Sequence, residues 1–325
     1  MRVTVRLLTT FVALALIGVS GGIARAEAAE GTPSQTGSTG LYRMATVADV
    51  GSGTVRPAFF GEVARSTNLL VLNDVDTRVI TRLAAAADFA RRAEVFASFS
   101  FSYNRDEQPI PDAPTILKTA LVPDLSLGAK GVAWRNDIFV VGGELGARVP
   151  MSASALPEAI SSWVDVLGSA YLWSGQRSSV RAHLSIGYYF DNSQKQLDVN
   201  NLTESDIEVL TFEHATGTDR FRIALGLEGA CQGQRSPLVR PFVEYHFERE
   251  RHTPNDRLLS EAFEGDNQQW LTLGLKAGIG PHLTIEAGVD VATVAAGIAF
   301  TPPLPPFDLW AGLTVPFQIS GRGQR

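Results

Sequence analysis

Cysteine is nearly absent from this chain: Cys231 is the only one in 325 residues, which excludes intramolecular disulfides and cysteine-rich metal sites. Charged residues make up only 19% and apolar residues 45%, so the chain is not intrinsically disordered. No repeat of period three or seven runs through it, which excludes collagen and coiled coils. The net charge of −6 argues against nucleic acid as a partner. No cofactor and no metal site are expected.

Long apolar runs are missing after residue 26. The run from Leu7 to Ala24 carries no charge, follows two arginines and precedes small-x-small cleavage sites, which is typical of a secretory signal peptide over residues 1–26. A retained membrane anchor is the alternative, because the run is almost long enough to span a bilayer. Residues 27–53 begin with small polar residues, so a flexible N-terminal segment is predicted there.

From residue 54 onward, segments of about ten residues alternate between apolar and polar positions, as residues 220–229 (RFRIALGLEG) illustrate. Side chains alternate across a strand, so each segment has one apolar and one polar face. Twelve strands are predicted, near residues 54–63, 76–88, 93–103, 121–134, 138–149, 163–173, 179–190, 219–230, 238–250, 268–279, 283–292 and 307–318.

Short and long connections take turns between these strands, and the strand number is even. Both features are typical of an outer-membrane barrel with tight periplasmic turns and long external loops. The sequence therefore predicts an all-β protein, an up-and-down antiparallel transmembrane β-barrel of about 12 strands over residues 54–319, with a tail at 320–325. We expect it in the outer membrane of a Gram-negative bacterium, after export through the inner membrane. A secreted β-sandwich with an adhesive role is an alternative.

Aromatic residues cluster near the predicted strand ends. Such rings favour the headgroup boundary of a membrane, so this set predicts an aromatic belt. The set includes Trp134, Trp163, Trp173, Tyr189 and Trp270.

The last strand ends in WAGLTVPF (residues 310–317), with Gly312, Val315 and Phe317 at the spacing Gly-x-x-apolar-x-aromatic. This spacing resembles the C-terminal signal by which the barrel-assembly machinery recognises outer-membrane barrels. It departs from that pattern at Trp310, where a polar residue is usual, and in the residues that follow Phe317.

Several glycine-rich stretches resemble OmpA-type barrels of the Gram-negative envelope: residues 121–131, 138–148, 180–192, 219–229 and 302–314. The resemblance covers roughly residues 54–319 and implies outer-membrane lipids and the assembly machinery as partners. Members often continue into a peptidoglycan-binding domain. Since this sequence stops at Arg325, that anchoring function is not expected.

If the apolar faces meet lipid, the polar faces line the lumen, with about as many cations as anions. Such a lumen is either a narrow passive pore for small solutes or an ion-paired structural plug. The residues predicted to line it are Glu144, Arg148, Arg181, His183, Arg220, Arg222, Glu228, Arg240, Glu244, His246, Lys276, Glu286 and Asp290.

An acyl hydrolase is the alternative function, because His183 and Ser185 form a His-x-Ser pair in which imidazole could activate the hydroxyl. Both residues share the face of Arg181, which is assigned to the lumen, whereas a lipid hydrolase needs its nucleophile at the lipid side. A barrel protease would need paired acid and histidine residues in the loops, and the spacing of His214, His252 and Asp256 does not single them out. No enzymatic activity is therefore predicted.

Overall fold

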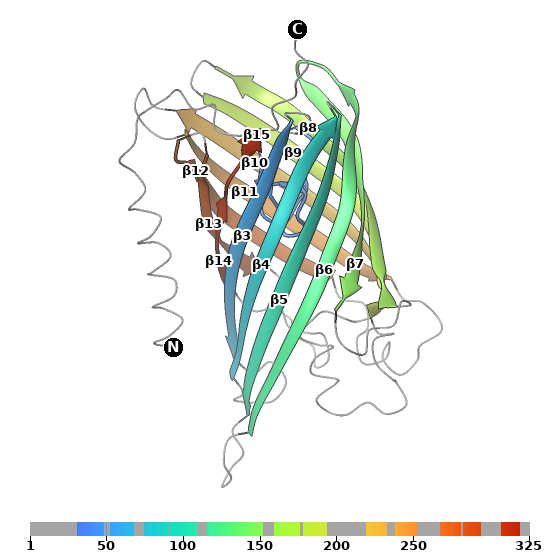
Figure 1. Cartoon of the computed structure of the whole chain (residues 1–325), viewed down its shortest axis with the longest axis vertical. Coiled ribbons are helices and arrows are strands. Elements are labelled where there is room, and N and C mark those ends of the chain that lie inside the picture. Colours follow the sequence, from blue (N-terminus) through green and yellow to red (C-terminus); the bar gives the residue numbers. More distant parts are fainter. Residues whose placement is uncertain are drawn as a thin grey trace.

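The computed structural model describes residues 31–48, 50, 53–67, 75–90, 92–108, 116–151, 159–175, 178–193, 219–232, 238–251, 267–280, 282–293 and 307–318. Twelve antiparallel strands, β3 to β14, form the wall of a barrel (Figure 1). Their bounds are β3 (Thr54–Thr67), β4 (Val75–Ala90), β5 (Ala93–Gln108), β6 (Ile116–Arg135), β7 (Phe139–Pro150), β8 (Ser161–Ser174), β9 (Ser178–Phe190), β10 (Asp219–Gln232), β11 (Leu238–Arg251), β12 (Asn267–Gly278), β13 (Thr284–Ala292) and β14 (Phe307–Thr314). None of the described residues forms a helix long and apolar enough to cross a membrane.

The barrel closes where the last strand, β14, pairs with the first, β3, in the register Asp308↔Ala64 to Thr314↔Ala58. The chain then leaves the ladder at Val315 and Pro316 and returns to β3 as β15 (Phe317–Gln318). Proline has no backbone N–H for the ladder, which accounts for the interruption. The predicted twelve-strand antiparallel barrel is confirmed, although β5 and β6 extend beyond the predicted ranges.

Connections alternate in length around the barrel, which distinguishes its two ends. Short connections follow β4, β6, β8, β10 and β12, and longer ones follow β3, β5, β7, β9, β11 and β13. We call these the short-turn end and the long-loop end.

The outer wall is apolar because the period-two pattern places one side chain in two away from the lumen. Leu145 is 62% exposed on β7, Val166 is 62% exposed on β8 and Leu225 is 50% exposed on β10. The residues between them, such as Glu144 and Asp165, are buried inside. An apolar exterior around a polar interior is the arrangement of a barrel that crosses a lipid bilayer.

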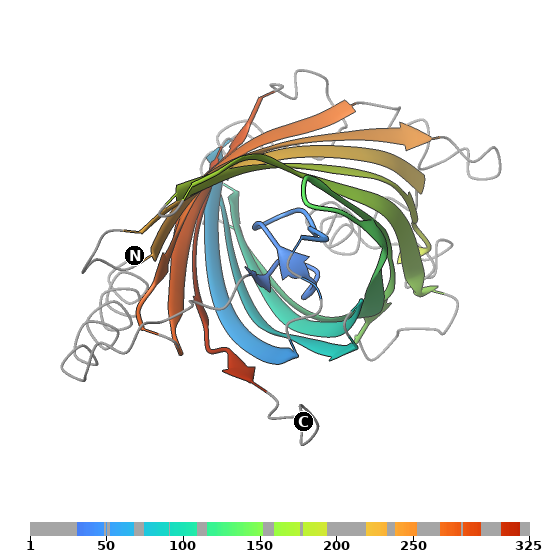
Figure 2. The same cartoon turned by 90° about the horizontal axis from the view of Figure 1, so that it is seen from above.

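Residues 31–48 and 50, here called the inner segment, fold inside the barrel (blue in Figure 2). They include the short hairpin strands β1 (Thr32–Pro33) and β2 (Thr39–Gly40). The structure thus differs from the flexible N-terminal segment that was predicted for residues 27–53. Small polar residues fit this place because their backbone groups find partners on the charged wall. The predicted signal peptide at 1–26 and the tail at 320–325 lie outside the described residues.

The aromatic belt is only partly as predicted. Trp134 and Trp173 are exposed on the outer wall, but Trp163, Tyr189 and Trp270 are buried in the lumen. Their positions follow strand parity: Trp163 precedes the outward Val164, and consecutive side chains face opposite sides. The prediction for these three rings was wrong.

Candidate functional site: the lumen and its inner segment

The inner segment is anchored near the short-turn end by a buried ion pair. Glu94 on β5 and Lys130 on β6 lie 3.1 Å apart, and both side chains are fully buried. Glu94 accepts hydrogen bonds from the backbone N of Thr39 (2.9 Å) and from its hydroxyl (2.6 Å). Lys130 Nζ donates to the carbonyl oxygens of Thr39 (2.6 Å) and Thr46 (2.7 Å). The Glu94–Lys130 pair therefore provides hydrogen-bond partners for both the backbone N–H and the carbonyl group of Thr39.

Two further cations of the wall hold the segment by its carbonyl groups. Lys276 Nζ on β12 donates to the carbonyl oxygen of Gly40 (2.5 Å) and to the Thr32 hydroxyl (2.7 Å). Arg135 at the end of β6 donates to the carbonyl oxygens of Ala48 (3.2 Å) and Val50 (3.1 Å). The barrel thus contacts the segment largely through long side chains that hydrogen-bond to its backbone.

Tyr42 and Arg43 extend the contacts to the opposite wall. The Glu244 carboxylate accepts hydrogen bonds from the backbone N of Tyr42 (2.5 Å) and of Arg43 (3.0 Å). The Tyr42 hydroxyl donates to Glu62 (2.8 Å), and Arg43 Nε donates to Asp290 (2.6 Å). Burial, together with the Glu62 carboxylate, raises the pKa of Tyr42 well above its usual value, so the phenol stays a hydrogen-bond donor.

Arg43 remains a cation in this enclosed place. Burial alone would lower its pKa, but the carboxylates of Asp290 and Glu62 raise that pKa above its usual value. Its guanidinium also lies 3.6 Å from Asp308 and 5.4 Å from the centre of the Trp270 ring.

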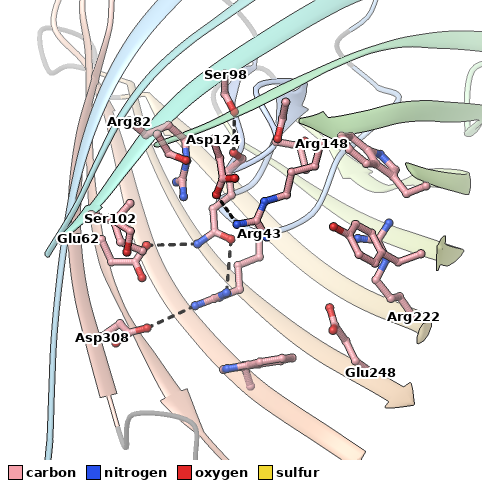
Figure 3. A pocket seen from close by; sticks show the side chains of 18 of the residues that line it. Arg43, Glu62, Arg82, Ser98, Ser102, Asp124, Arg148, Arg222, Glu248 and Asp308 are labelled. Atoms are coloured by element: carbon pink, nitrogen blue, oxygen red, sulfur yellow. Dashed lines mark hydrogen bonds and ion pairs between the residues drawn. The ribbon is translucent and has the colours of Figure 1, made fainter. Parts of the chain in front are cut away.

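A cavity of about 270 Å³, here called the vestibule, lies between the inner segment and the wall (Figure 3). Its lining residues belong to the halves of the strands nearest the long-loop end. Six arginines and four carboxylates line it: Arg43, Arg78, Arg82, Arg148, Arg220, Arg222, Glu62, Asp124, Glu248 and Asp308. A smaller space of about 130 Å³, lined partly by Met44, Ser185 and His246, lies beside the inner segment.

The vestibule exists because β5 has only small side chains on its inward face there. Ser98, Ser100 and Ser102 occupy three successive inward positions, and Ser126 faces the same space from β6. Trp163, Tyr189 and Trp270 also line the cavity. Serine hydroxyls and aromatic rings thus share this wall with the charges.

Most charges of the vestibule are paired with one another. Arg78 lies 3.1 Å from Asp308 and 3.4 Å from Glu62, and Arg148 contacts Asp124. On the other side, Arg220 pairs with Asp191 (3.1 Å) and Glu248 (3.4 Å), and Arg222 pairs with Asp165 (3.1 Å). Desolvated charges require such partners.

All thirteen residues predicted to line the lumen are buried or half-buried inside the barrel. The structure brings several of them together as Arg181–Glu228 (3.0 Å), Arg240–Glu228 (3.9 Å), Lys276–Glu286 (4.0 Å) and His246–Glu244 (2.9 Å). Asp308 was missed, although it shares the parity of Trp310 and Gly312. Arg43 was missed because residues 27–53 were predicted to be a flexible N-terminal segment.

The residues of the predicted insertion signal have different surroundings. Gly312 faces the lumen, where the Phe60 ring lies against it. Val315 donates a backbone hydrogen bond to the carbonyl oxygen of Pro57 (2.9 Å), and Phe317 is exposed on β15.

The His-x-Ser pair lies in the lumen. His183 Nδ1 is hydrogen-bonded to the hydroxyl of Ser169 (2.9 Å), and its Nε2 lies 3.8 Å from Glu228. Ser185 is buried beside the smaller space and faces away from the outer wall. The serine bonded to the imidazole is therefore Ser169 and not Ser185. His214, His252 and Asp256 lie outside the described residues. Among the residues that the structure describes, no group of histidine, cysteine and acidic side chains could hold a metal ion.

The fold and the lumen together define a class: a closed, 12-stranded antiparallel β-barrel with an apolar exterior and a charged interior that holds the chain's own N-terminal segment. No protein-family description matches the sequence. No curated protein matches it either.

Solved structures resemble the chain at low identity. An outer-membrane channel from Pseudomonas putida F1 is 12% identical with a TM-score of 0.51, over 82% of this chain and 97% of the channel. The NanC porin is 10% identical with a TM-score of 0.48, over 80% of this chain and 98% of the porin. The transport unit of the autotransporter AIDA-I from Escherichia coli is 9% identical with a TM-score of 0.47, over 84% and 92%. At such identities, the likeness to the Pseudomonas channel shows the fold alone.

Proposed function

We propose that the protein is an outer-membrane channel for small polar solutes, narrowed by its own inner segment. The vestibule carries this proposal, because a water-accessible, polar space leads from the long-loop half of the lumen to the inner segment. A barrel that served only as a scaffold would have no need of a hollow lined by three serines on one strand.

The way in which the inner segment is held supports a movable constriction. Its two strands pair with each other and belong to a separate sheet from the barrel. Among the described residues, the other hydrogen bonds that join two backbone groups and involve the segment also stay within it. Its backbone contacts with the barrel are made to side chains. The segment can therefore shift by exchanging side-chain contacts for water, without breaking the barrel ladder.

The apolar outer wall supports residence in the outer membrane of a Gram-negative bacterium, with outer-membrane lipids as neighbours. Export through the inner membrane would depend on residues 1–26. Recognition by the barrel-assembly machinery would use Gly312, Val315 and Phe317. Kinship with OmpA-type envelope barrels stays a prediction.

A structural role in the envelope is the second candidate, and one observation favours it. The short-turn half of the lumen contains fully buried ion pairs, including Glu94–Lys130 and Arg56–Asp88 (both 3.1 Å). A permanently closed barrel would stiffen the membrane without conducting.

Single-channel conductance in planar bilayers separates the two candidates. We expect small steps from the whole mature protein and larger, steadier steps from a variant that lacks residues 31–50. Glu244→Ala, which removes the acceptor of Tyr42 and Arg43, offers a milder release should the deletion impair folding. If all three proteins migrate as heat-modifiable barrels and none conducts, the channel function is wrong and the structural role remains.

A further inference from the structure

Arg82 on β4 differs from the other arginines of the vestibule. Each of the other five has a carboxylate within 4 Å. No ion pair of that length joins Arg82 to any residue in the described part of the chain, yet Arg82 lines the cavity (Figure 3). Glu62 interacts electrostatically with Arg82 at longer range. The Glu62 carboxylate, however, already accepts hydrogen bonds from Arg78 (3.4 Å) and Tyr42 (2.8 Å). A half-buried guanidinium without a contact partner favours an external anion.

The strand register surrounds Arg82 with further donors. Arg82 lies directly opposite Ser100, and Ser100 lies opposite Asp124 on β6, whose carboxylate contacts Arg148. In the next row along the barrel, Ser126 lies between Ser98 and Arg148. Side chains opposite each other on one face lie about 5 Å apart, and diagonal neighbours about 7–8 Å apart, so Arg82, Ser100, Ser126 and Arg148 share one patch of wall. The patch also contains Asp124, whose charge is balanced by Arg148. Within the described residues, the hydroxyls of Ser100 and Ser126 have no protein partner in the hydrogen-bond pattern, and both face the vestibule. Guanidinium and hydroxyl donors therefore meet at this patch.

We propose that this patch of the vestibule binds the carboxylate of a small organic acid, with Arg82 as its ionic partner and Ser100 and Ser126 as hydroxyl donors. The planar guanidinium matches a carboxylate in a two-bond fork. A cation is disfavoured, because all four carboxylates that line the vestibule already contact an arginine. Pockets for drug-sized ligands generally have volumes of about 300–1,000 Å³. The vestibule, with a volume of about 270 Å³, therefore suits a smaller ligand of a few carbon atoms.

This inference rests on the proposed channel function, because it names the class of solute that the channel mouth would select. Binding can nevertheless be measured without conduction. The probe is sodium succinate, titrated calorimetrically into the folded, detergent-solubilised mature protein while sodium chloride keeps the ionic strength constant. Succinamide, which has the same carbon chain without charge, is the matched ligand control.

We expect saturable succinate binding to the wild type, at least tenfold weaker binding to Arg82→Gln, and none of succinamide. Arg105→Gln is the matched protein control, because Arg105 is exposed outside the vestibule and pairs with Glu107 (2.6 Å). Its affinity should equal that of the wild type. Equal melting temperatures of the variants show that Arg82→Gln has not disturbed the barrel.

The proposal is overturned if succinate does not saturate, if Arg82→Gln binds it as tightly as the wild type, or if succinamide binds equally well. Chloride that competes at the same concentration as succinate would also overturn the assignment to a carboxylate. Succinate binding without channel conductance keeps the site and removes the channel. Conductance without succinate binding keeps the channel function and removes the carboxylate site.

Discussion

Tyr42 of the inner segment stacks on Trp310 of the last barrel strand, with ring centroids 3.8 Å apart and ring planes 4° from parallel. The same tyrosine donates a hydrogen bond to Glu62 on the first strand (2.8 Å). Because β3 and β14 close the barrel, Tyr42 contacts both sides of the seam from within. The inner segment therefore links the first and last strands as well as narrowing the lumen. Stacking also accounts for an aromatic residue at position 310.

Replacing Tyr42 should destabilise the whole barrel. Tyr42→Ala removes a fully buried ring, and such truncations cost about 3–5 kcal/mol in the free energy of unfolding. The thermal or urea midpoint of the heat-modifiable band measures this loss. Trp173→Ala, which truncates an exposed ring on the outer wall, should shift the midpoint far less. Equal shifts in both variants would argue against a link across the seam.

Tyr42→Phe separates stacking from hydrogen bonding. It keeps the ring on Trp310 and removes only the donor to Glu62, so we expect a loss of about 1 kcal/mol. The same midpoint measurement applies. A loss as large as that of Tyr42→Ala would mean that the hydroxyl, and not the stacked ring, holds the seam.

Lys130→Met should release the inner segment near the short-turn end. It leaves the fully buried Glu94 with only the more distant Arg56 (4.0 Å) as a cationic neighbour, and breaking a buried ion pair from one side costs about 3–5 kcal/mol. Limited proteolysis of the folded barrel should then cut within residues 31–48, which should be protected in the wild type. The double variant Glu94→Gln with Lys130→Met removes the stranded charge and should recover part of the protection.

Arg65→Met serves as the control for that experiment, because Arg65 is an exposed cation in β3 near the long-loop end. It should leave the protease pattern unchanged. Cleavage of residues 31–48 at the same rate in the wild type and in Lys130→Met would contradict anchoring by this ion pair.

The barrel wall was predictable because the information for it is local. In β10, apolar and polar positions alternate over ten residues, and this alternation alone sets which residues face inward. Arg220, Glu228 and the other charges of that parity lie inside, as their positions in the strands imply. Trp163 and Trp270 follow the same rule: both have the parity of the inward-facing positions, and their location near strand ends does not turn them outward.

The inner segment was not predictable from local pattern. Thr39 has its partners at Glu94 and Lys130, and Tyr42 has its partner at Trp310, far along the chain. Small polar residues are typical of flexible tails when nothing satisfies their backbone groups. Here a charged lumen satisfies them, and that environment exists only once the twelve strands have closed.

Ser185→Ala tests the enzymatic alternative. Because His183 is hydrogen-bonded to Ser169 and both His183 and Ser185 face the lumen, the variant should not change any phospholipid hydrolysis measured with the purified protein. Ser169→Ala is the companion variant, since it removes the actual partner of the imidazole. Hydrolysis by the wild type that Ser185→Ala abolishes, with the fold intact, would establish an acyl hydrolase against this expectation.

Gly312→Ala distinguishes a packing role of this glycine from a role in recognition by the assembly machinery. A Cβ at position 312 would lie 2.4 Å from the Phe60 ring, whereas a Cβ at the neighbouring Gly61 would meet nothing within 4 Å. Overpacking of this kind costs about 1–3 kcal/mol. Gly312→Ala should therefore lower the stability of barrels that are folded in detergent without the assembly machinery. Gly61→Ala should not lower it. Adding Phe60→Leu to Gly312→Ala should restore part of the lost stability. Normal folding of Gly312→Ala in detergent, combined with failed insertion in cells that Phe60→Leu does not rescue, would instead assign the glycine to recognition.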